Sequence, residues 1–235
     1  MTLQELIDDS RRIVFFGGAG VSTESGIPDF RSADGLYNQK YAYPPEQIVS
    51  HSFFLRHTEE FYRFYRDRMI FPDARPNPAH LKLAELERAG KLSCVITQNI
   101  DGLHQAAGSR NVIELHGSVH RNRCMSCGKK YPLSAVTDCE GIPRCACGGI
   151  IKPEVVLYEE SLDDGDLARA MTEISAADML IIGGTSLAVY PAAGLVKFFG
   201  GKHLVVINKS AISADSSAEL KITDNIGSVM EKIRC

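Results

Sequence analysis

The chain lacks any apolar run long enough to cross a membrane. Its apolar runs, such as residues 13–16 and 179–182, have the length of strands, whereas a membrane-spanning helix needs about 20 apolar residues. The N-terminus also lacks the basic start and the unbroken apolar stretch of a secretory signal, and its pattern predicts a surface helix instead. We therefore expect a soluble protein that has no membrane partner.

An excess of basic charge is missing as well. The 26 lysines and arginines are outnumbered by 29 aspartates and glutamates, which gives a formal net charge of -3. A general nucleic-acid-binding protein needs a concentrated basic face that displaces counterions, so direct nucleic-acid binding is not expected. With 235 residues and neither repeats nor low-complexity tracts, the chain fits one nucleotide-binding domain with insertions, and a monomer is the expected state.

Short runs of β-branched and aromatic residues predict the strands of a buried parallel sheet. They lie at residues 13–16, 94–97, 112–115, 179–182 and 203–207. Amphipathic helical patterns alternate with them, at 79–89, which follows Pro78 and stops at Gly90, and at 167–176. Because alternating strands and helices build doubly wound α/β folds, we predict a Rossmann-like doubly wound parallel sheet.

Two segments interrupt this alternation. Residues 32–76 contain an aromatic-rich helical stretch at 53–70 and are predicted to form a helical insert. Residues 119–151 have little apolar periodicity and hold five of the seven cysteines, so they are predicted to form a zinc-binding module that needs its metal to fold. The remaining residues, 1–31, 77–118 and 152–235, form the predicted nucleotide-binding domain.

The cysteine spacing predicts a closed metal site. Cys124 and Cys127 form one pair, Cys145 and Cys147 form a second, tighter pair, and a glycine follows each pair. Four thiolates leave no open coordination position, which indicates a structural zinc ion and not a catalytic one. The tighter second pair leaves Cys139 as an alternative ligand. An odd number of cysteines arranged for a metal indicates a reducing compartment, so we expect a cytoplasmic location.

Polar residues follow three of the predicted strands, at the edge where open α/β sheets bind ligands. The first strand runs into a glycine turn at 17–20 that can present backbone N–H groups to a phosphate, although an ordinary glycine turn is an alternative. A dehydrogenase fingerprint fails, since Thr23 stands in place of its third glycine. Asn99 and Asp101 are candidate ligand-binding residues or helix caps. His116 is a candidate general base, because the histidine pKa of roughly 6.5 suits proton transfer near neutrality.

Three longer motifs resemble the sirtuin family. They are Thr-Glu-Ser-Gly-Ile-Pro-Asp-Phe-Arg at 23–31, Thr-Gln-Asn-Ile-Asp-Gly-Leu-His at 97–104, and Gly-Gly-Thr-Ser-Leu at 183–187, in the family's order. The resemblance extends from residue 13 to about residue 226. It implies NAD-dependent removal of acetyl or short apolar acyl groups from protein lysines, with nicotinamide and O-acyl-ADP-ribose as products. NAD is then a consumed co-substrate, and acylated proteins or peptides are the partners.

The resemblance also implies roles for individual residues. His116 is the implied general base, and Asn99 is the second implied catalytic residue. The implied NAD-binding residues, which include these two, are Gly18, Ala19, Gly20, Thr23, Asp29, Phe30, Arg31, Gln98, Asn99, Ile100, Asp101, His116, Gly184, Thr185, Ser186, Asn208 and Ile226. The implied contacts of the substrate peptide are Val156, Leu157, Tyr158 and Val189, with pairing of backbones along one strand.

Two departures from the family pattern concern the substrate. Sirtuins commonly have Phe-Gly-Glu where this chain has Tyr158-Glu159-Glu160, within a stretch of six acidic residues from 154 to 166 that either attracts basic peptides or is a solvated loop. Sirtuins that favour acidic acyl groups have Tyr-x-x-Arg on the insert. With Tyr62 in register, the fourth position here is Tyr65, which favours acetyl and short apolar acyl groups, although Arg66 could still share a helix face with Tyr62.

Two other functions compete with deacylation. An NAD glycohydrolase or ADP-ribosyltransferase would use the same pocket with another nucleophile. A non-enzymatic zinc-ribbon protein would use the cysteine module to bind DNA or protein. The acidic charge balance and the presence of both Asp101 and His116 weigh against the second alternative.

Overall fold

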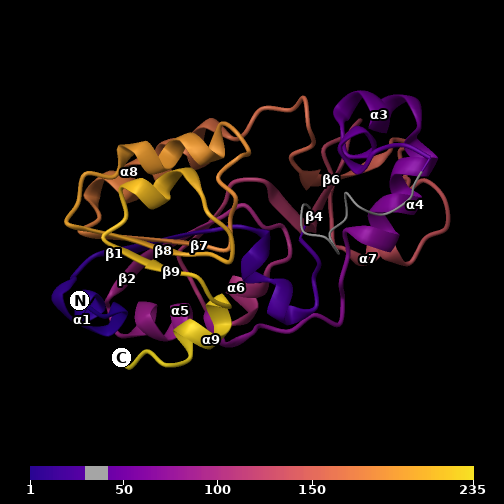
Figure 1. Ribbon diagram of the computed structural model, residues 1–235. Helices are drawn as coiled ribbons and strands as arrows, with labels where there is room; N and C mark the ends of the chain where they lie inside the picture. Colours follow the sequence, from indigo (N-terminus) through magenta and orange to yellow (C-terminus); the bar gives the residue numbers. More distant parts are fainter. Residues whose placement is uncertain (30–41) are drawn as a thin grey trace.

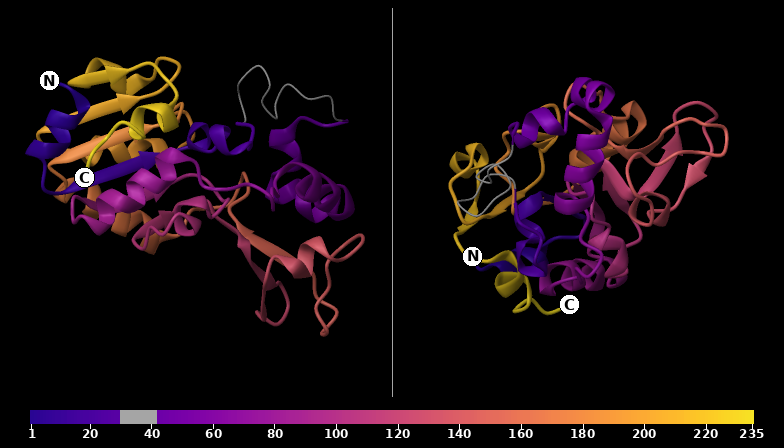
Figure 2. Two further views of the ribbon diagram at one scale, coloured as in Figure 1. Left: turned by 90° about the horizontal axis from the view of Figure 1, so that it is seen from below. Right: turned by 90° about the vertical axis from the view of Figure 1, so that its right-hand side faces the viewer.

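The computed structural model describes residues 1–29 and 42–235. Figure 1 shows two lobes, a large sheet covered by helices on both faces and a smaller lobe that carries β4, β6, α3, α4 and α7. The two lobes are also separate in the views of Figure 2. Within the described residues, no helix is both long enough and apolar enough to span a membrane.

The large lobe is built on six parallel strands. Their order across the sheet is β3-β2-β1-β7-β8-β9. The strands are β1 (Ile13–Gly17), β2 (Leu92–Thr97), β3 (Val112–Glu114), β7 (Met179–Gly183), β8 (His203–Ile207) and β9 (Leu220–Ile222). This order reverses direction between β1 and β7, as in the Rossmann fold, and it confirms the predicted doubly wound sheet.

Alternate residues of the central strand enter two different cores. Ile13 and Phe15 point to the face covered by α1 (Leu3–Asp9), α5 (Pro78–Arg88) and α9 (Ile226–Met230). Val14 and Phe16 point to the opposite face, covered by α8 (Asp164–Ala176) and the 3₁₀ helix η4 (Ala192–Phe198). All four side chains are fully buried, because a central parallel strand has helices on both sides.

Local signals set the helix boundaries in this lobe. α5 begins after its N-cap Asn77, whose side chain accepts a hydrogen bond from the backbone N–H of Ala79, and it has Pro78 at its first position. Gly90 follows its end with a φ of +74°, a conformation that glycine adopts without strain. The predicted helix at 79–89 is therefore confirmed within one residue of each end.

The smaller lobe combines the predicted insert with the predicted zinc module. The insert holds α2 (Pro45–Ile48), α3 (His51–Arg56) and α4 (Thr58–Arg68), so the predicted helical stretch at 53–70 is two helices that meet at His57. The module contains α7 (Ser134–Thr137) and an antiparallel sheet in the order β5-β4-β6. These strands are β4 (Gly117–Cys124), β5 (Lys130–Tyr131) and β6 (Ile151–Val155).

The insert and the module share one apolar core. Phe54 and Phe61 of the insert belong to the same buried cluster as Val119, Val136 and Val155 of the module. The antiparallel sheet also continues beyond the predicted limits of the module, from residue 117 to residue 155. The two segments are thus packed as one lobe, while the predicted division into three domains stays a prediction.

Candidate active site

The predicted ligand residues meet at one cavity of about 1250 Å³ between the two lobes. Loops that follow β1, β2, β3, β7 and β8 form its wall on the side of the sheet, and residues of the insert and of β6 form the other side. Within the described part of the chain, every predicted NAD-binding and peptide-binding residue lines this cavity. Phe30 and Arg31 lie outside the described residues.

The glycine turn after β1 packs directly against a second glycine turn after β7. The N–H of Gly20 donates a hydrogen bond to Gly184 O over 2.8 Å, and a Cβ atom on Gly20 would lie 2.8 Å from the Cα of Gly184. Only glycine fits this close approach. Two short 3₁₀ helices follow the first glycine turn, η1 (Ala19–Val21) and η2 (Thr23–Ser25).

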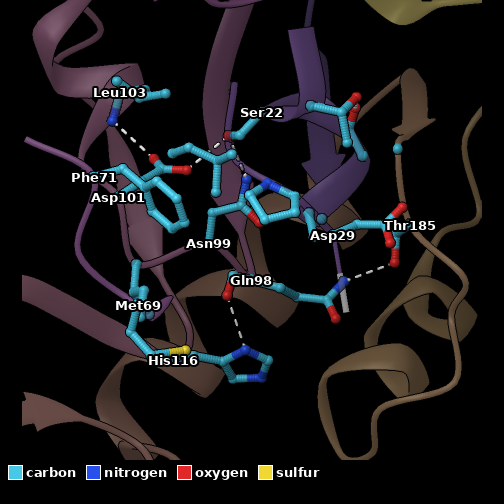
Figure 3. A pocket seen from close by; sticks show the side chains of 18 of the residues that line it. Ser22, Asp29, Met69, Phe71, Gln98, Asn99, Asp101, Leu103, His116 and Thr185 are labelled. Atoms are coloured by element: carbon cyan, nitrogen blue, oxygen red, sulfur yellow. Dashed lines mark hydrogen bonds between the residues drawn. The ribbon is translucent and has the colours of Figure 1, made fainter. Parts of the chain in front are cut away.

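Three polar side chains form a buried hydrogen-bonded chain at one end of the cavity. Ser22 Oγ donates to Asp101 Oδ2 over 2.7 Å and accepts from Asn99 Nδ2 over 3.0 Å, as Figure 3 shows. The other oxygen of Asp101 accepts from the N–H of Leu103 at the start of α6 (Leu103–Ala106). Asp101 therefore lines the cavity and accepts the first N–H of α6, while the N-cap position of that helix is Gly102.

Burial affects the pKa of Asp101. Desolvation raises its pKa above the ordinary carboxyl value, while the hydrogen bonds from Ser22 and Leu103 act in the opposite direction. Sequence reasoning missed Ser22, although a hydroxyl residue directly after a glycine turn and before Thr23 was the available signal. It also missed Met69 and Phe71, apolar residues after α4 that Figure 3 shows beside His116 and Asp101.

His116 follows β3, and its tautomer is fixed by the backbone. Its Nδ1 lies 2.9 Å from Gln98 O, and because a carbonyl oxygen can only accept, Nδ1 carries the proton (Figure 3). The other ring nitrogen, Nε2, is then the basic one. Burial lowers the pKa of His116 below its ordinary value of 6.5, and the bond to Gln98 offsets only part of this shift. The ring is therefore neutral at pH 7.

Three other histidines have different surroundings from His116. The rings of His80 and His104 lie 4.7 Å apart in the interior, at most 1% exposed, and neither lines the cavity. His120 does line the cavity, and its Nε2 lies 3.1 Å from Asp101 O. A second imidazole therefore lies beside Asp101 in the cavity.

Residues after β2, β7 and β8 continue the cavity wall. Gln98 Nε2 donates to Thr185 Oγ1 over 3.0 Å, and this bond joins the second strand's loop to the second glycine turn. Asn208 donates through Nδ2 to Ser210 O over 2.7 Å, so it stabilises a turn and lines the cavity at the same time. Ile226 begins α9 and is 3% exposed.

The four cysteines of the two predicted pairs come together in the smaller lobe. All four Sγ atoms of Cys124, Cys127, Cys145 and Cys147 lie within 4.8 Å of one another. Neighbouring sulfurs are 3.5 Å and 3.6 Å apart across the two pairs, close to the roughly 3.8 Å edge of a tetrahedron with Zn–S bonds of about 2.3 Å.

The surroundings of the cysteines also fit a zinc ion. A Cβ atom on Gly149 would lie 2.7 Å from Cys124 Sγ, so the chain can close around the sulfurs only with glycine there. Tyr131 donates its hydroxyl to Cys145 Sγ over 3.0 Å, a contact that orients the thiolate. Cys139 is not part of the group, since its sulfur contacts Arg66 Nη2 at 3.2 Å. The group therefore consists of the two predicted pairs, and the alternative considered from the sequence, Cys139, lies outside it.

The insert residues considered for acyl preference divide between the module and the cavity. Tyr62 donates its hydroxyl to Ile151 O over 2.5 Å, and Arg66 lies over the Tyr62 ring while donating to Val136 O and Gly141 O. Both side chains thus bind the zinc module. Tyr65 and Arg68 line the cavity instead, so the predicted register with Tyr62 at the acyl site is wrong, because the helix turns that residue away.

The carboxyl edge of the parallel sheet carries two glycine turns, a buried carboxylate and a neutral imidazole. These features define a nucleotide-binding enzyme of the Rossmann-like class, which here has an added four-cysteine site. Comparison with known proteins places it more closely. Residues 18–191 match the Sir2 family. The chain belongs to the Sir2 family, the sirtuins.

Curated relatives and solved structures agree with this assignment. The NAD-dependent protein deacetylase of Clostridium acetobutylicum is 59% identical, and the alignment covers 98% of this chain and 96% of that protein. The NAD-dependent protein deacetylase of Clostridium perfringens is 60% identical, with the same coverage. A Sir2 structure with a deacetylated p53 peptide and 3'-O-acetyl ADP-ribose is 41% identical, has a TM-score of 0.89, and covers 98% of this chain and 96% of that one.

Proposed function

We propose that His116 is the general base of an NAD-dependent deacetylation that takes place in the cavity between the lobes. The chain is an NAD-dependent protein deacetylase, as its relatives of 59% and 60% identity are named along nearly their whole length. The observation that carries the role of His116 is its tautomer, since the Gln98 carbonyl fixes the proton on Nδ1 and leaves Nε2 basic at neutral pH.

NAD is the co-substrate, and the residues that line the cavity suit its parts. We assign the pyrophosphate to the glycine turns, because Gly18 and Gly20 have no side chains and let the phosphates approach the backbone. We assign the nicotinamide end to Asp101, which accepts a hydrogen bond from Ser22, whose hydroxyl in turn accepts one from Asn99. The adenosine end then falls at Asn208 and Ile226, and the predicted contacts of Phe30 and Arg31 remain predictions.

The reaction needs a base near the ribose and a dry cavity. The acyl oxygen of the substrate lysine attacks the ribosyl carbon as nicotinamide leaves, and His116 Nε2 then accepts a proton from a ribose hydroxyl. An amide oxygen is a poor nucleophile, so close placement and exclusion of water supply much of the rate. The apolar side chains of Met69, Phe71 and Ile100, which line the cavity, support this exclusion.

The substrate is an acylated lysine in a protein or peptide. Sir2 structures exist with a p53 peptide and NAD, and in this chain Val156, Leu157, Tyr158 and Val189 line the cavity, which supports a peptide site there. We propose that acetyl and short apolar acyl groups are accepted, because Val49 and Leu133 line the cavity, although Tyr65 and Arg68, which have the Tyr-x-x-Arg spacing, line it too and favour acidic acyl groups. Rates with acetyl, butyryl, lactyl and succinyl peptides measure this preference.

We also propose a cytoplasmic location. The support is the cysteine chemistry, since all seven cysteines are free thiols and four of them form a cluster that must stay reduced to hold zinc. Alkylation of the cysteines before and after lysis measures their redox state in cells.

The decisive experiment replaces the base. His116→Ala is expected to lower deacetylation by about 10²- to 10⁴-fold, the usual contribution of a general base, while NAD still binds. The measurement is formation of O-acetyl-ADP-ribose by mass spectrometry from NAD and an acetylated peptide. His57→Ala, a change in a half-exposed histidine of the insert, is the matched control and should keep its activity. Wild-type turnover in the His116 variant would refute the assignment.

A further inference from the structure

Two adjacent carboxylates follow the proposed peptide segment, and both are already engaged by other parts of the chain. Glu159 accepts hydrogen bonds from the N–H of Ser52 over 2.8 Å and from its hydroxyl over 3.0 Å. Glu160 accepts from His51 Nδ1 over 2.7 Å and from Lys152 Nζ over 3.1 Å. Both carboxylates are therefore engaged within the chain before a peptide binds.

The backbone of Glu159 has an uncommon conformation. Its φ is +75°, in the left-handed region, which glycine adopts more readily than glutamate. A residue with a Cβ atom is strained in this region relative to the right-handed one. Such a conformation persists only where surrounding contacts hold it, and it is concentrated at binding sites. The two bonds to Ser52 are contacts of this kind, since they fix the side chain to the beginning of α3.

Most of the neighbouring backbone groups already have partners, whereas Glu159 offers an N–H and a C=O together to a peptide. The N–H of Val156 donates to His116 O, the N–H of Tyr158 donates to Val49 O, and Tyr158 O accepts from the N–H of His51. The N–H of Leu157 donates to Glu160 Oε2, and Leu157 O accepts from the N–H of Glu160. Within the described residues, the backbone N–H and C=O of Glu159 have no such partner, and this residue lines the cavity.

We propose that the Ser52–Glu159 contact is a clamp that holds Glu159 in the left-handed conformation and thereby positions its backbone N–H and C=O to pair with the acylated peptide. This inference rests on the proposed function. Glu159 acts as a positioning residue through its side chain, and Ser52 transmits the position of the insert to the peptide site. Because other residues form the NAD end of the cavity, the clamp affects the peptide alone.

Four variants separate the effect of the clamp on peptide binding from the effects of charge and of backbone conformation. Glu159→Ala removes the clamp and keeps the strain. Glu159→Gly removes the clamp and the strain together. Glu159→Gln keeps an oxygen that can accept from Ser52, and Asp164→Asn removes one charge from an exposed position of the same acidic stretch. Fluorescence anisotropy with a labelled acetyl-lysine peptide, at saturating ADP-ribose, measures the peptide Kd without turnover, and steady-state kinetics give KM for NAD.

Glu159→Ala is expected to weaken peptide binding about 10-fold, which corresponds to about 1.4 kcal/mol, with KM for NAD unchanged. Glu159→Gly should lose less, because glycine adopts the left-handed conformation freely, and Glu159→Gln should stay close to the wild type. Asp164→Asn should have no effect. Melting temperatures within a few degrees of the wild type show that each variant is folded.

Three results would overturn the clamp. A wild-type peptide Kd in Glu159→Ala would remove the role of the side chain. Equal losses in Glu159→Ala and Asp164→Asn would assign the effect to charge. A rise of KM for NAD in parallel with the peptide Kd would indicate a general structural role. A wild-type protein that binds no acetylated peptide would contradict the proposed function as well, whereas these three results contradict the clamp alone.

Discussion

The two lobes are stabilised in different ways. In the sheet lobe, both faces of the central strand are buried in extensive apolar cores, and Ile13, Val14, Phe15 and Phe16 are all 0% exposed. Around the cysteines of the smaller lobe, the buried cluster contains only Cys124, Cys145 and Ile151. The first lobe can fold by burying apolar surface, whereas the cysteine end of the second needs a metal.

The active site takes its precision from the meeting of these two lobes. His116 lies between the last residue of β3 in the large sheet and the first residue of β4 in the small one. Asp101 follows β2, and Tyr65 and Met69 come from the insert. A change that loosens the smaller lobe should therefore affect the peptide side of the cavity before it affects the NAD side.

Removal of zinc tests the contrast most strongly. Structural zinc contributes roughly 10–16 kcal/mol in small zinc-finger peptides, so chelation or Cys145→Ser should unfold the segment around the cysteines while the sheet lobe stays folded. Hydrogen exchange with mass spectrometry should show fast exchange in 119–151 and protection in the strands of the large sheet. Cys139→Ser, outside the cysteine group, is the control and should exchange like the wild type. Equal exchange in both lobes after chelation would break the comparison.

A cavity in the sheet core tests the other lobe. Phe15→Ala should reduce the free energy of unfolding by about 3–5 kcal/mol, because a fully buried aromatic ring is lost and the packed strand cannot collapse around the space. Urea denaturation measures the loss. Phe198→Ala, at a side chain that is 47% exposed, should change it by less than about 0.5 kcal/mol. A comparable loss in both variants would show that the sheet core is not the main source of stability.

The pH dependence of the deacetylation rate tests the role of His116, which lies where the two lobes meet. The folded-state pKa of His116 is lowered by burial, so its ring stays neutral and basic until the pH falls through that lowered value. The rate of deacetylation should therefore be constant near pH 7 and fall about 10-fold per pH unit on an acid limb whose midpoint is below 6.5. A midpoint above 6.5 in a plot of kcat/KM for the peptide against pH would exclude a buried His116 as the base.

Two tyrosines of α4 test how hydrogen bonding stabilises the smaller lobe, and the expected effects are the smallest. The hydroxyl of Tyr65 is buried and has no hydrogen-bond partner among the described residues, whereas that of Tyr62 donates to Ile151 O. Tyr65→Phe should leave the free energy of unfolding unchanged or raise it by about 1 kcal/mol, and Tyr62→Phe should lower it by about 1 kcal/mol because a buried carbonyl loses its partner. Thermal or urea unfolding measures both. Equal changes in the two variants would contradict the difference in bonding.

Much of the molecule is predictable from local patterns. Apolar runs predicted five of the six parallel strands, and only the short β9 was missed, because its residues are half-exposed at an edge of the sheet. Cysteine spacing predicted the four grouped thiols. The motifs after the strands predicted residues that line one cavity, since the carboxyl ends of parallel strands lie at one edge.

The errors have a common physical origin. The turn of Tyr62 toward the zinc module and the contact between Ser52 and Glu159 both depend on residues far apart in the sequence. A helical pattern gives the spacing of side chains, but it does not give the rotation of the helix against its neighbours. Propensity and periodicity therefore predict individual helices and strands, but they do not predict how these elements pack against one another.

Local sequence patterns are enough to predict the parallel sheet, the cysteine set and the order of the ligand-binding loops, because each of these depends on the period or spacing of nearby residues. The tautomer of His116, the partners of Asp101 and the conformation of Glu159 become visible only in the folded chain. These features depend on which distant atoms share a buried space, where the cost of an unpaired polar group selects one arrangement.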